Sequence, residues 1–465
     1  MADELWRKSA TELADAIKKR EVSSREVIES HLARIEDVNA RVNAVVVVTG
    51  DQARAAADAA DAKTRSGADL GALHGVPYTV KLNIDVEGQA TNEAVTALAD
   101  VIAPSDAPMV VKMRAAGAII IGRTNLPDFG LRINTESQLY GSTHNPWDHS
   151  RTAGGSSGGE AAAIASGMSP MGLGNDIGGS LRNPAYACGI ASIKPSFGRV
   201  AHANDSTPID PLLNSQLMLA EGVLARTVGD VRLGLVTVMG SDPRDPHAID
   251  APLEGPSRPR RAAIVAEPPG GETDPGVADG VRVAAQALRD EGYEVDEVEP
   301  PNIVEAYIAW TELMYSGLDV VRPLLDGLMG EGGRRFLELT NLEVPAPTPA
   351  SLSAMHQLRH RIHRSWQEFF AEYPVIVGPT WTQPPFPLGW DIESSENAMK
   401  VMELFRFVLP ANLMGLPAAC VPTGIRNGMP VGAQIISSRL REDLCLNAAA
   451  AIERQLGPLT PIDPR

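Results

Sequence analysis

Residues 1–65 show the spacing of hydrophobic and polar positions that is typical of helices. Two capping boxes, each a serine followed three positions later by a glutamate, open the first two predicted helices: Ser9 with Glu12, and Ser23 with Glu26. Hydrophobic residues then recur every three or four positions from Ile28 to Val38, so one helix face is expected to be buried. With a further alanine-rich helix at 52–63, this part is predicted to form an N-terminal helical layer.

Beyond this layer, short hydrophobic runs alternate with helical segments. The runs have the length and composition of buried strands, and we predict strands at 44–48, 76–80, 119–122, 171–174, 262–266, 375–378, 418–422 and 432–437. Helices are predicted at 107–116, at 276–291 and across most of 302–372. This alternation predicts an α/β fold with a mixed, largely parallel, twisted central sheet that helices cover on both faces.

The composition narrows the class of protein. A chain of 465 residues with 44% hydrophobic residues can bury a large core. Its formal net charge of −17 argues against nucleic acid or an anionic membrane as a partner. We therefore expect a small-molecule substrate, no nucleic acid and no membrane partner, and either a monomer or a homodimer.

Cysteine usage and the amino terminus bear on the compartment. The three cysteines, Cys188, Cys420 and Cys445, show no paired spacing, so neither a disulfide framework nor a zinc knuckle is expected. The amino terminus is charged and lacks a signal-type hydrophobic core, and no run approaches the roughly 20 residues of a membrane span. We expect a cytoplasmic protein with no cofactor.

Three segments carry the residue types needed to cleave an amide, which requires a nucleophile, a base and donors for the oxyanion. Lys81 ends a hydrophobic run, Ser156 lies in the glycine-serine segment 154–159, and Ser180 follows two glycines. A neutral lysine amine can take a seryl proton, directly or through a second hydroxyl, and burial lowers the pKa of a lysine. The segments therefore indicate a serine hydrolase that cleaves amides without histidine.

Other interpretations of the glycine-serine segment are weaker. A flexible linker would not run directly into the helix-forming residues 160–165. A phosphate-binding loop would end in Gly-Lys-Ser/Thr, but Glu160 stands there. The segment also fits the G-x-S-x-G nucleophile elbow with Ser156 as the nucleophile, yet that motif follows a buried strand, and residues 143–151 predict a turn-rich loop.

His356, His360 and His363 share one face of a helix predicted from about 351 to 372, a spacing that can hold a metal. An H-E-x-x-H motif requires a glutamate where Gln357 stands, and nearby arginines would oppose a cation. We predict a solvated helix face and no metal site.

The three segments, in this order and spacing, resemble the amidase signature family. The glycine-serine segment continues to Ser180 along the family signature almost throughout, and further matches lie at 122–127, 194–200, 412–418 and 428–434. The resemblance implies a single domain, 1–465, with a signature core at 70–240, a helical segment at 300–372 over the active site and a C-terminal part of the core at 373–455. Segments rich in proline and glycine are then expected to be surface loops: 250–259, 267–276 and 344–349.

The resemblance also implies roles for single residues. Ser180 is expected to be the nucleophile, Ser156 the bridging serine after a cis peptide bond, and Lys81 the terminal base. The backbone N–H groups of four residues would form the oxyanion hole: Ile177, Gly178, Gly179 and Ser180. Supporting and substrate-contacting roles fall on a further set: Asn175, Asp176 and Arg182 around the nucleophile loop, and Gly130, Leu131 and Ser157 at the substrate.

Three departures from the family pattern lie near these residues. Leu82 stands where relatives commonly carry an acid, Ala153 where a proline often precedes the glycines, and Asn175 where threonine is usual. None replaces a member of the expected triad. Residues 201–219 do not match the pattern of glutamyl-tRNA amidotransferase subunits, which disfavours transamidation.

The resemblance implies an amidohydrolase that cleaves a small, largely apolar aliphatic or aryl amide through an acyl-serine intermediate, giving an acid plus an amine or ammonia. Four residues are candidates for an apolar pocket: Leu213, Leu217, Met314 and Phe336. Hydrolysis of a carbamate, an anilide or an ester stays open on the same site, as a urethanase or an aryl acylamidase would perform. A non-catalytic binding or scaffold protein of the same fold is the other alternative, but it would be expected to lose one of the three catalytic residues.

Overall fold

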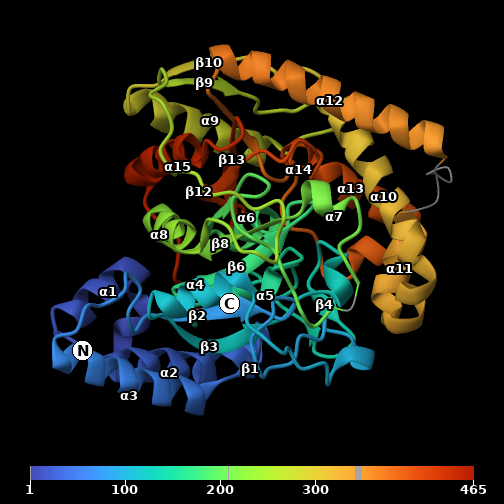
Figure 1. Ribbon diagram of the computed structural model, residues 1–465. Helices are drawn as coiled ribbons and strands as arrows, with labels where there is room; N and C mark the ends of the chain where they lie inside the picture. The colour runs from blue at the N-terminus through green and yellow to red at the C-terminus, as the bar shows by residue number, and fades with distance from the viewer. Residues whose placement is uncertain (1, 208, 341–347) are drawn as a thin grey trace.

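The computed structural model describes residues 2–207, 209–340 and 348–465, and one large twisted sheet runs through it (Figure 1). Within the described residues this sheet has eleven strands. In spatial order they are β1 (Val45–Val48), β3 (Ile119–Thr124), β2 (Pro77–Lys81), β6 (Met171–Asp176), β8 (Ala220–Ala225), β7 (Ala191–Lys194), β12 (Ala418–Arg426), β13 (Met429–Ser437), β11 (Val375–Pro379), β9 (Arg261–Ile264) and β10 (Glu294–Glu297).

The sheet is mixed, as predicted. Parallel pairs form two groups, β3-β2-β6 and β11-β9-β10, and antiparallel pairs lie between them and at the β1 edge. The centre of the sheet contains more antiparallel pairs than the alternation of strands and helices predicts. One of these pairs is the hairpin of β12 and β13, whose turn contains Asn427 and Gly428 at positive φ. A small separate sheet pairs β4 (Glu136–Ser137) with β5 (Gly141–Ser142).

Helices cover both faces of the sheet, and each face has its own hydrophobic cluster. Successive residues of one strand point to opposite faces, so Ile435 and Ile436 of β13 join different clusters. Helices whose residues belong mainly to the first cluster are α2 (Ser24–Val42), α5 (Gly158–Ala165), α6 (Arg182–Cys188), α10 (Ile303–Leu328), α11 (Glu331–Thr340), α12 (Pro349–Glu372), α13 (Ser395–Leu404) and α14 (Leu409–Leu413). Those of the second are α1 (Ala10–Lys18), α4 (Pro108–Ala115), α8 (Val228–Val238), α9 (Pro275–Asp290) and α15 (Glu442–Leu456).

The predicted N-terminal layer is present, and both capping boxes form as expected. Helices α1, α2 and α3 (Gly50–Ser66) lie together at one end of the molecule in Figure 1, while α10 and α12 lie at the other side. The predicted helical stretch at 302–372 is three helices within the described residues. The loop predicted at 344–349 falls largely outside them.

Three strands of the large sheet were not predicted from the sequence: β7, β8 and β10. The two short strands β4 and β5 were not predicted either. Strand β8 contains Glu221 and Gly222, and β10 is mostly acidic, so neither has the hydrophobic run that marks the other strands. Their positions follow from pairing with neighbours that the local sequence does not reveal.

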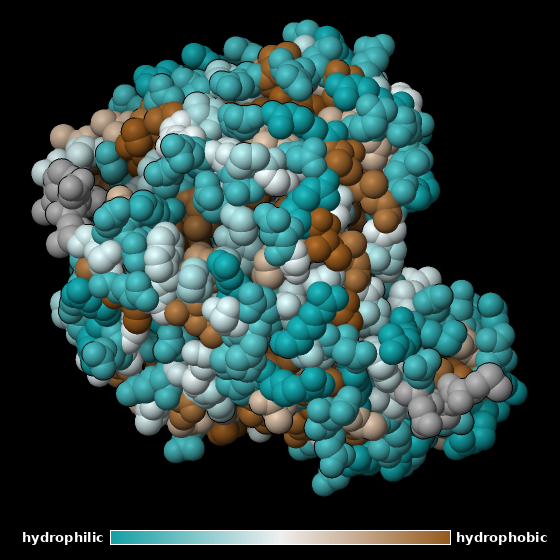
Figure 2. Space-filling model, turned by 180° about the vertical axis from the view of Figure 1, so that it is seen from behind, coloured by the Kyte–Doolittle hydropathy of each residue, from teal (hydrophilic) through white to brown (hydrophobic). Residues whose placement is uncertain are grey.

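Surface and thiol chemistry follow the composition. The face in Figure 2 is mostly hydrophilic, with hydrophobic residues in small groups. The three cysteines are free and buried. In the described part of the chain, no helix combines the length and hydrophobicity needed to cross a membrane.

Candidate active site

Lys81 is the last residue of β2, a strand in which every residue is buried. Its side chain has no exposed surface, and its Nζ donates to Ser156 Oγ at 2.7 Å and to Asn175 Oδ1 at 2.8 Å. The buried strand that the hydrophobic run predicted therefore places the amine of Lys81 in the protein interior, next to the hydroxyl of Ser156.

Burial lowers the pKa of Lys81 from the usual value to about 8. Four carboxyl groups oppose this shift when they are ionised, because negative charge favours the ammonium form: Glu93, Glu221, Asp176 and Glu160. Burial raises the pKa of Glu93 to about 7 and that of Glu160 to about 8, so both lose their charge below those values. A minor but useful fraction of the amine is therefore neutral near pH 7, and the fraction grows as the pH rises.

Ser156 lies in the tight loop between Ala153 and α5. The Gly155–Ser156 peptide bond is cis, as the resemblance implied. Gly154 has a φ of 78°, and a Cβ there would lie 2.6 Å from the Cα of Pro184, so only glycine fits. The loop therefore packs closely against α6, and it places the hydroxyl of Ser156 within hydrogen-bonding distance of the Lys81 amine.

Ser180 lies in the loop between β6 and α6, two residues before the helix begins at Arg182. Its carbonyl accepts a hydrogen bond from the Ser157 N–H at 3.3 Å, so the two serine loops are adjacent. Within the described residues, no hydrogen bond joins the hydroxyls of Ser156 and Ser180. The structure thus brings the three expected residues into one buried region, with Ser156 in contact with Lys81.

The loop of residues 177–180 presents backbone N–H groups beside Ser180. Those of Ile177, Gly178 and Ser180 donate to no other group in the described residues, whereas that of Gly179 donates to Asp176 Oδ1 at 2.7 Å. Gly179 therefore braces the loop, and the set of expected oxyanion donors narrows to the other three.

Asp176 and Arg182 form the brace expected of them. Both side chains are fully buried, and two hydrogen bonds of 3.0 Å join the guanidinium to the carboxylate. Burial alone would raise the pKa of Asp176, but the charge and hydrogen bonds of Arg182 outweigh it and lower it to about 2. Asn412 also donates to Asp176, at 2.8 Å, so this carboxylate stays ionised and anchors both ends of the loop.

The other expected site residues divide into two groups. Gly130 lies against the site, since a Cβ on it would be 3.2 Å from Ser156 Oγ, and Leu131 packs next to it against the first hydrophobic cluster. The side chain of Ser157 is fully buried, and its hydroxyl lies against Gly174 of β6. Of the three residues expected at the substrate, Gly130 is therefore the one placed directly against Ser156.

The surroundings of the loop are apolar. Trp310 of α10 donates from its indole N–H to the Ile177 carbonyl at 2.9 Å, and its ring lies 2.7 Å from where a Gly178 Cβ would be. Partly buried Phe129 and Leu217 belong to the same hydrophobic cluster. Of the four residues expected in the pocket, Leu213 is instead 55% exposed, while Met314 and Phe336 are buried in the core.

Sequence reasoning missed a further set of charged side chains in this region. Glu93 and Glu221 act electrostatically on Lys81, and His202 binds Glu221; the three residues come from separate segments. Glu221 pairs with Asn175 across β8 and β6, and its carboxylate binds His202 Nδ1 at 2.6 Å. No motif in the sequence marks these residues, because strand pairing brings them together.

The described residues contain no cluster of His, Cys, Asp and Glu suited to a metal ion. His356, His360 and His363 lie on α12, where burial and neighbouring arginines lower the pKa of His363 to about 4. The positive charge of these arginines disfavours a cation beside His363.

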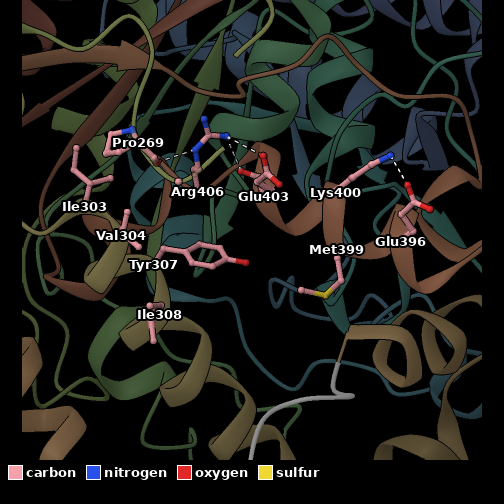
Figure 3. Close-up of a pocket in the computed structure, with 11 residues that line it drawn as sticks. Pro269, Ile303, Val304, Tyr307, Ile308, Glu396, Met399, Lys400, Glu403 and Arg406 are labelled. Atoms are coloured by element: carbon pink, nitrogen blue, oxygen red, sulfur yellow. Dashed lines mark hydrogen bonds and ion pairs between the residues drawn. The ribbon is translucent and has the colours of Figure 1, made fainter. Parts of the chain in front are cut away.

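A separate cavity of about 440 Å³ lies between α10 and α13 (Figure 3). Tyr307 and Arg406 line it, and Arg406 forms an ion pair with Glu403. Neither Lys81 nor either expected serine lines this cavity, so it is distinct from the candidate active site.

Comparison with known proteins is consistent across sequence and structure. The family model described as Amidase matches residues 26–446. Indoleacetamide hydrolase of Bradyrhizobium diazoefficiens is 42% identical over 465 aligned residues, covering 98% of this chain and 88% of that protein. A glutamyl-tRNA(Gln) amidotransferase subunit of Anaeromyxobacter sp. strain K is 34% identical, covering 98% of both chains. A bacterial aryl acylamidase of the amidase signature enzymes superposes with a TM-score of 0.83 at 26% identity, covering 96% of each chain.

Proposed function

The chain belongs to the amidase signature family, and on that basis we propose that it hydrolyses a small, largely apolar amide through an acyl-Ser180 intermediate. The observation that carries this proposal is the 2.7 Å hydrogen bond from Lys81 Nζ to Ser156 Oγ in a fully buried pocket. It supplies a base and a relay hydroxyl next to the loop of Ser180.

In the first step, Ser180 Oγ attacks the amide carbonyl carbon. Its proton passes to Ser156 Oγ as the proton of Ser156 passes to the neutral amine of Lys81. The carbonyl π electrons move to oxygen, and the oxyanion accepts hydrogen bonds from the N–H groups of Ile177, Gly178 and Ser180. Catalytic hydrogen bonds often tighten only when substrate is bound, which accounts for the absent direct bond between the two hydroxyls.

The intermediate then collapses. The carbon-nitrogen bond breaks as the leaving nitrogen takes a proton from Ser156, which regains one from Lys81. The acyl group stays on Ser180. Water attacks this ester, its proton enters the same relay, and cleavage of the ester bond releases the acid and restores the hydroxyl of Ser180.

The apolar surroundings favour a hydrophobic acyl group. Trp310, Phe129 and Leu131 gather near the loop of Ser180 and near Ser156. The 42% identity to a protein named indoleacetamide hydrolase directs us to arylacetamides that release ammonia as the first substrates. Anilides, esters and carbamates react through the same acyl-enzyme steps and stay as alternative substrates.

Membership of an amidotransferase complex is the alternative from a different class, since a protein named as a glutamyl-tRNA(Gln) amidotransferase subunit matches nearly the whole chain. The isolated chain would then hydrolyse simple amides poorly. We favour the stand-alone hydrolase because the relative named as a hydrolase is the more similar of the two, at 42% against 34% identity.

The test is a hydrolysis panel of arylacetamides, aliphatic amides, anilides, esters and carbamates, run with the wild-type chain and Ser180→Ala. A sulfonyl fluoride probe followed by peptide mapping gives a readout that needs no substrate. Labelling confined to the peptide of Ser180, with turnover abolished in the variant, is the expected result. Full turnover by a folded Ser180→Ala variant would refute the assignment.

A further inference from the structure

A polar connection leads from Lys81 away from the serines. Asn175 Oδ1 accepts from Lys81 Nζ, and the amides of Asn175 and Asn83 bind each other at 3.2 Å. On the neighbouring strand, Glu221 stands directly opposite Asn175. Side chains of directly opposite residues lie on the same face of a sheet, so Glu221 points to the Lys81 side.

Glu221 is held in an unusual way for a carboxylate. One oxygen binds His202 Nδ1 at 2.6 Å, while the other is buried and has no hydrogen-bond partner in the described residues. A buried, half-satisfied carboxylate costs stability, and here its field reaches Lys81. The side chain of His202 is 27% exposed, so the pair extends from Lys81 toward solvent.

Glu93 approaches Lys81 from a different segment. Its backbone has a φ of 48°, and its carbonyl accepts a hydrogen bond from the Phe129 N–H at 3.0 Å, which ties it to the loop of Gly130. Burial raises the pKa of its carboxyl group to about 7, so this group loses its charge as the pH falls below that value. Glu93 is therefore not a fixed negative charge over the pH range in which Lys81 titrates.

Building on the proposed function, we propose that Glu221, bound to His202, is a positioning group that sets how readily Lys81 loses its proton. In the described residues it forms no hydrogen bond to the nucleophile or to the relay serine. Its negative charge stabilises the ammonium form of Lys81, and the hydrogen bond to His202 holds the carboxylate in place.

Other charged groups near these residues do not take this role. Asp176 is neutralised by Arg182, Glu160 accepts hydrogen bonds from Thr79 and Thr124, and Arg123 binds backbone carbonyls that include that of Lys81. Around the proposed group itself, Asp85 acts on Glu93, and Asp245 acts on His202. Burial would lower the pKa of His202, but the hydrogen bond to Glu221 raises it.

The proposal predicts a shift in one direction. Replacing the carboxylate by its neutral isostere, in Glu221→Gln, removes negative charge and moves the acid limb of the rate profile to lower pH, by about one unit. At a pH below that limb, the variant would then react up to roughly tenfold faster than wild type. A purely structural role would lower the rate at every pH without moving the limb.

The experiment measures the rate of inactivation by phenylmethylsulfonyl fluoride across neutral and alkaline pH, with kcat/KM on any amide that turns over. Glu254→Gln is the matched control, because it removes the same charge from an exposed surface ion pair with Arg232. Circular dichroism and thermal unfolding establish that each variant is folded.

An acid limb that moves to lower pH in Glu221→Gln, with the limb of Glu254→Gln unmoved, supports the proposal. If Glu221→Gln keeps the wild-type limb, or moves it upward, the proposal is wrong. The proposed function fails differently, since the probe would then label a residue other than Ser180 or none.

Discussion

Two opposing effects set the pKa of the Lys81 amine. Full burial favours the neutral form, while nearby carboxyl groups favour the charged form, and the result is a pKa of about 8 instead of the usual value. The sequence predicted the burial, and a neutral amine with it. It did not predict the carboxyl groups that keep the pKa within reach of physiological pH.

The first prediction concerns the pH dependence of wild-type turnover. Only neutral Lys81 can accept a proton, so kcat/KM should rise about tenfold per pH unit below pH 8 and level off above it. The measurement is kcat/KM on a neutral amide, which does not titrate in this range. A rate that is constant from about pH 6 to 9 would contradict Lys81 as the terminal base.

The second prediction concerns Asp176. Asp176→Asn leaves the guanidinium of Arg182 buried without its counter-ion, which should lower the free energy of unfolding by about 3–5 kcal/mol. Urea denaturation gives this value, and Glu254→Gln is the control at an exposed pair, where about 0–1 kcal/mol is expected. A loss below about 1 kcal/mol in Asp176→Asn would show that the brace is not needed for stability.

The low pKa of Asp176 also predicts how the free energy of unfolding depends on pH. Its pKa falls from the usual range to about 2 on folding, so its contribution to stability is present above its unfolded pKa. That contribution is lost as the pH falls through about 2. Acid unfolding should therefore occur at higher pH in Asp176→Asn, which lacks this contribution at every pH.

At the residue scale, local motifs located the candidate catalytic residues in the sequence. Lys81, Ser156 and Ser180 each lie in a distinctive short segment, so the sequence alone brought them together as candidates. Glu221 and His202 have ordinary local sequences, and only the register of β6 with β8 places them near Lys81.

At the scale of elements, helix α10 packs directly against the loop of residues 177–180. The indole of Trp310 binds the Ile177 carbonyl and covers Gly178. Gly178 does not have a positive φ, so alanine suits its backbone, and the atoms nearest to a Cβ there all belong to the Trp310 ring. The helix that covers the active site therefore also fixes the direction of the backbone donors.

The third prediction is a double-mutant cycle on this contact. Gly178→Ala should lower kcat by about 100-fold, because the clash with Trp310 displaces an oxyanion donor. In a Trp310→Ala background, which removes the ring, the further loss caused by Gly178→Ala should be about tenfold or less. Both kcat and KM are measured, since a displaced donor acts mainly on kcat.

Gly179→Ala is the control for that cycle. Gly179 has a φ of 97°, and a Cβ there would lie 2.5 Å from Asn183 and from Val408, so alanine should be harmful in both backgrounds. Equal losses from Gly178→Ala with and without Trp310 would mean that the ring does not position the loop.

The elements themselves were predictable where burial was complete. Strands β2, β3, β6 and β11 are hydrophobic and buried along their length, and each was located from the sequence. Strand β10 lies at the sheet edge with little burial, so its composition carries no such signal. The antiparallel centre depends on which strands pair, which hydrophobic runs do not specify.

At the scale of the whole molecule, the N-terminal layer is joined to distant parts of the chain. The Ala10 N–H donates to Asp230 at 2.9 Å, and the guanidinium of Arg226 binds the Trp6 carbonyl at 2.7 Å. Arg34 forms an ion pair with Asp463 at 2.8 Å. Both hydrophobic clusters also extend from the N-terminal helices to the C-terminal strands, so no boundary divides the core of the described residues along the sequence.

The fourth prediction follows from this continuity and tests the proposed single domain. Far-UV circular dichroism and tryptophan fluorescence should report one denaturation midpoint, because Trp6 near the start and Trp381 in the later core belong to a continuous structure. A Trp6→Phe variant removes the fluorescence of Trp6, so the difference between the wild-type and variant signals reports on the N-terminal layer. If the N-terminal layer were an independent unit, its signal would be lost at a lower denaturant concentration than that of Trp381, since contacts such as Arg34 with Asp463 would then not link the two regions.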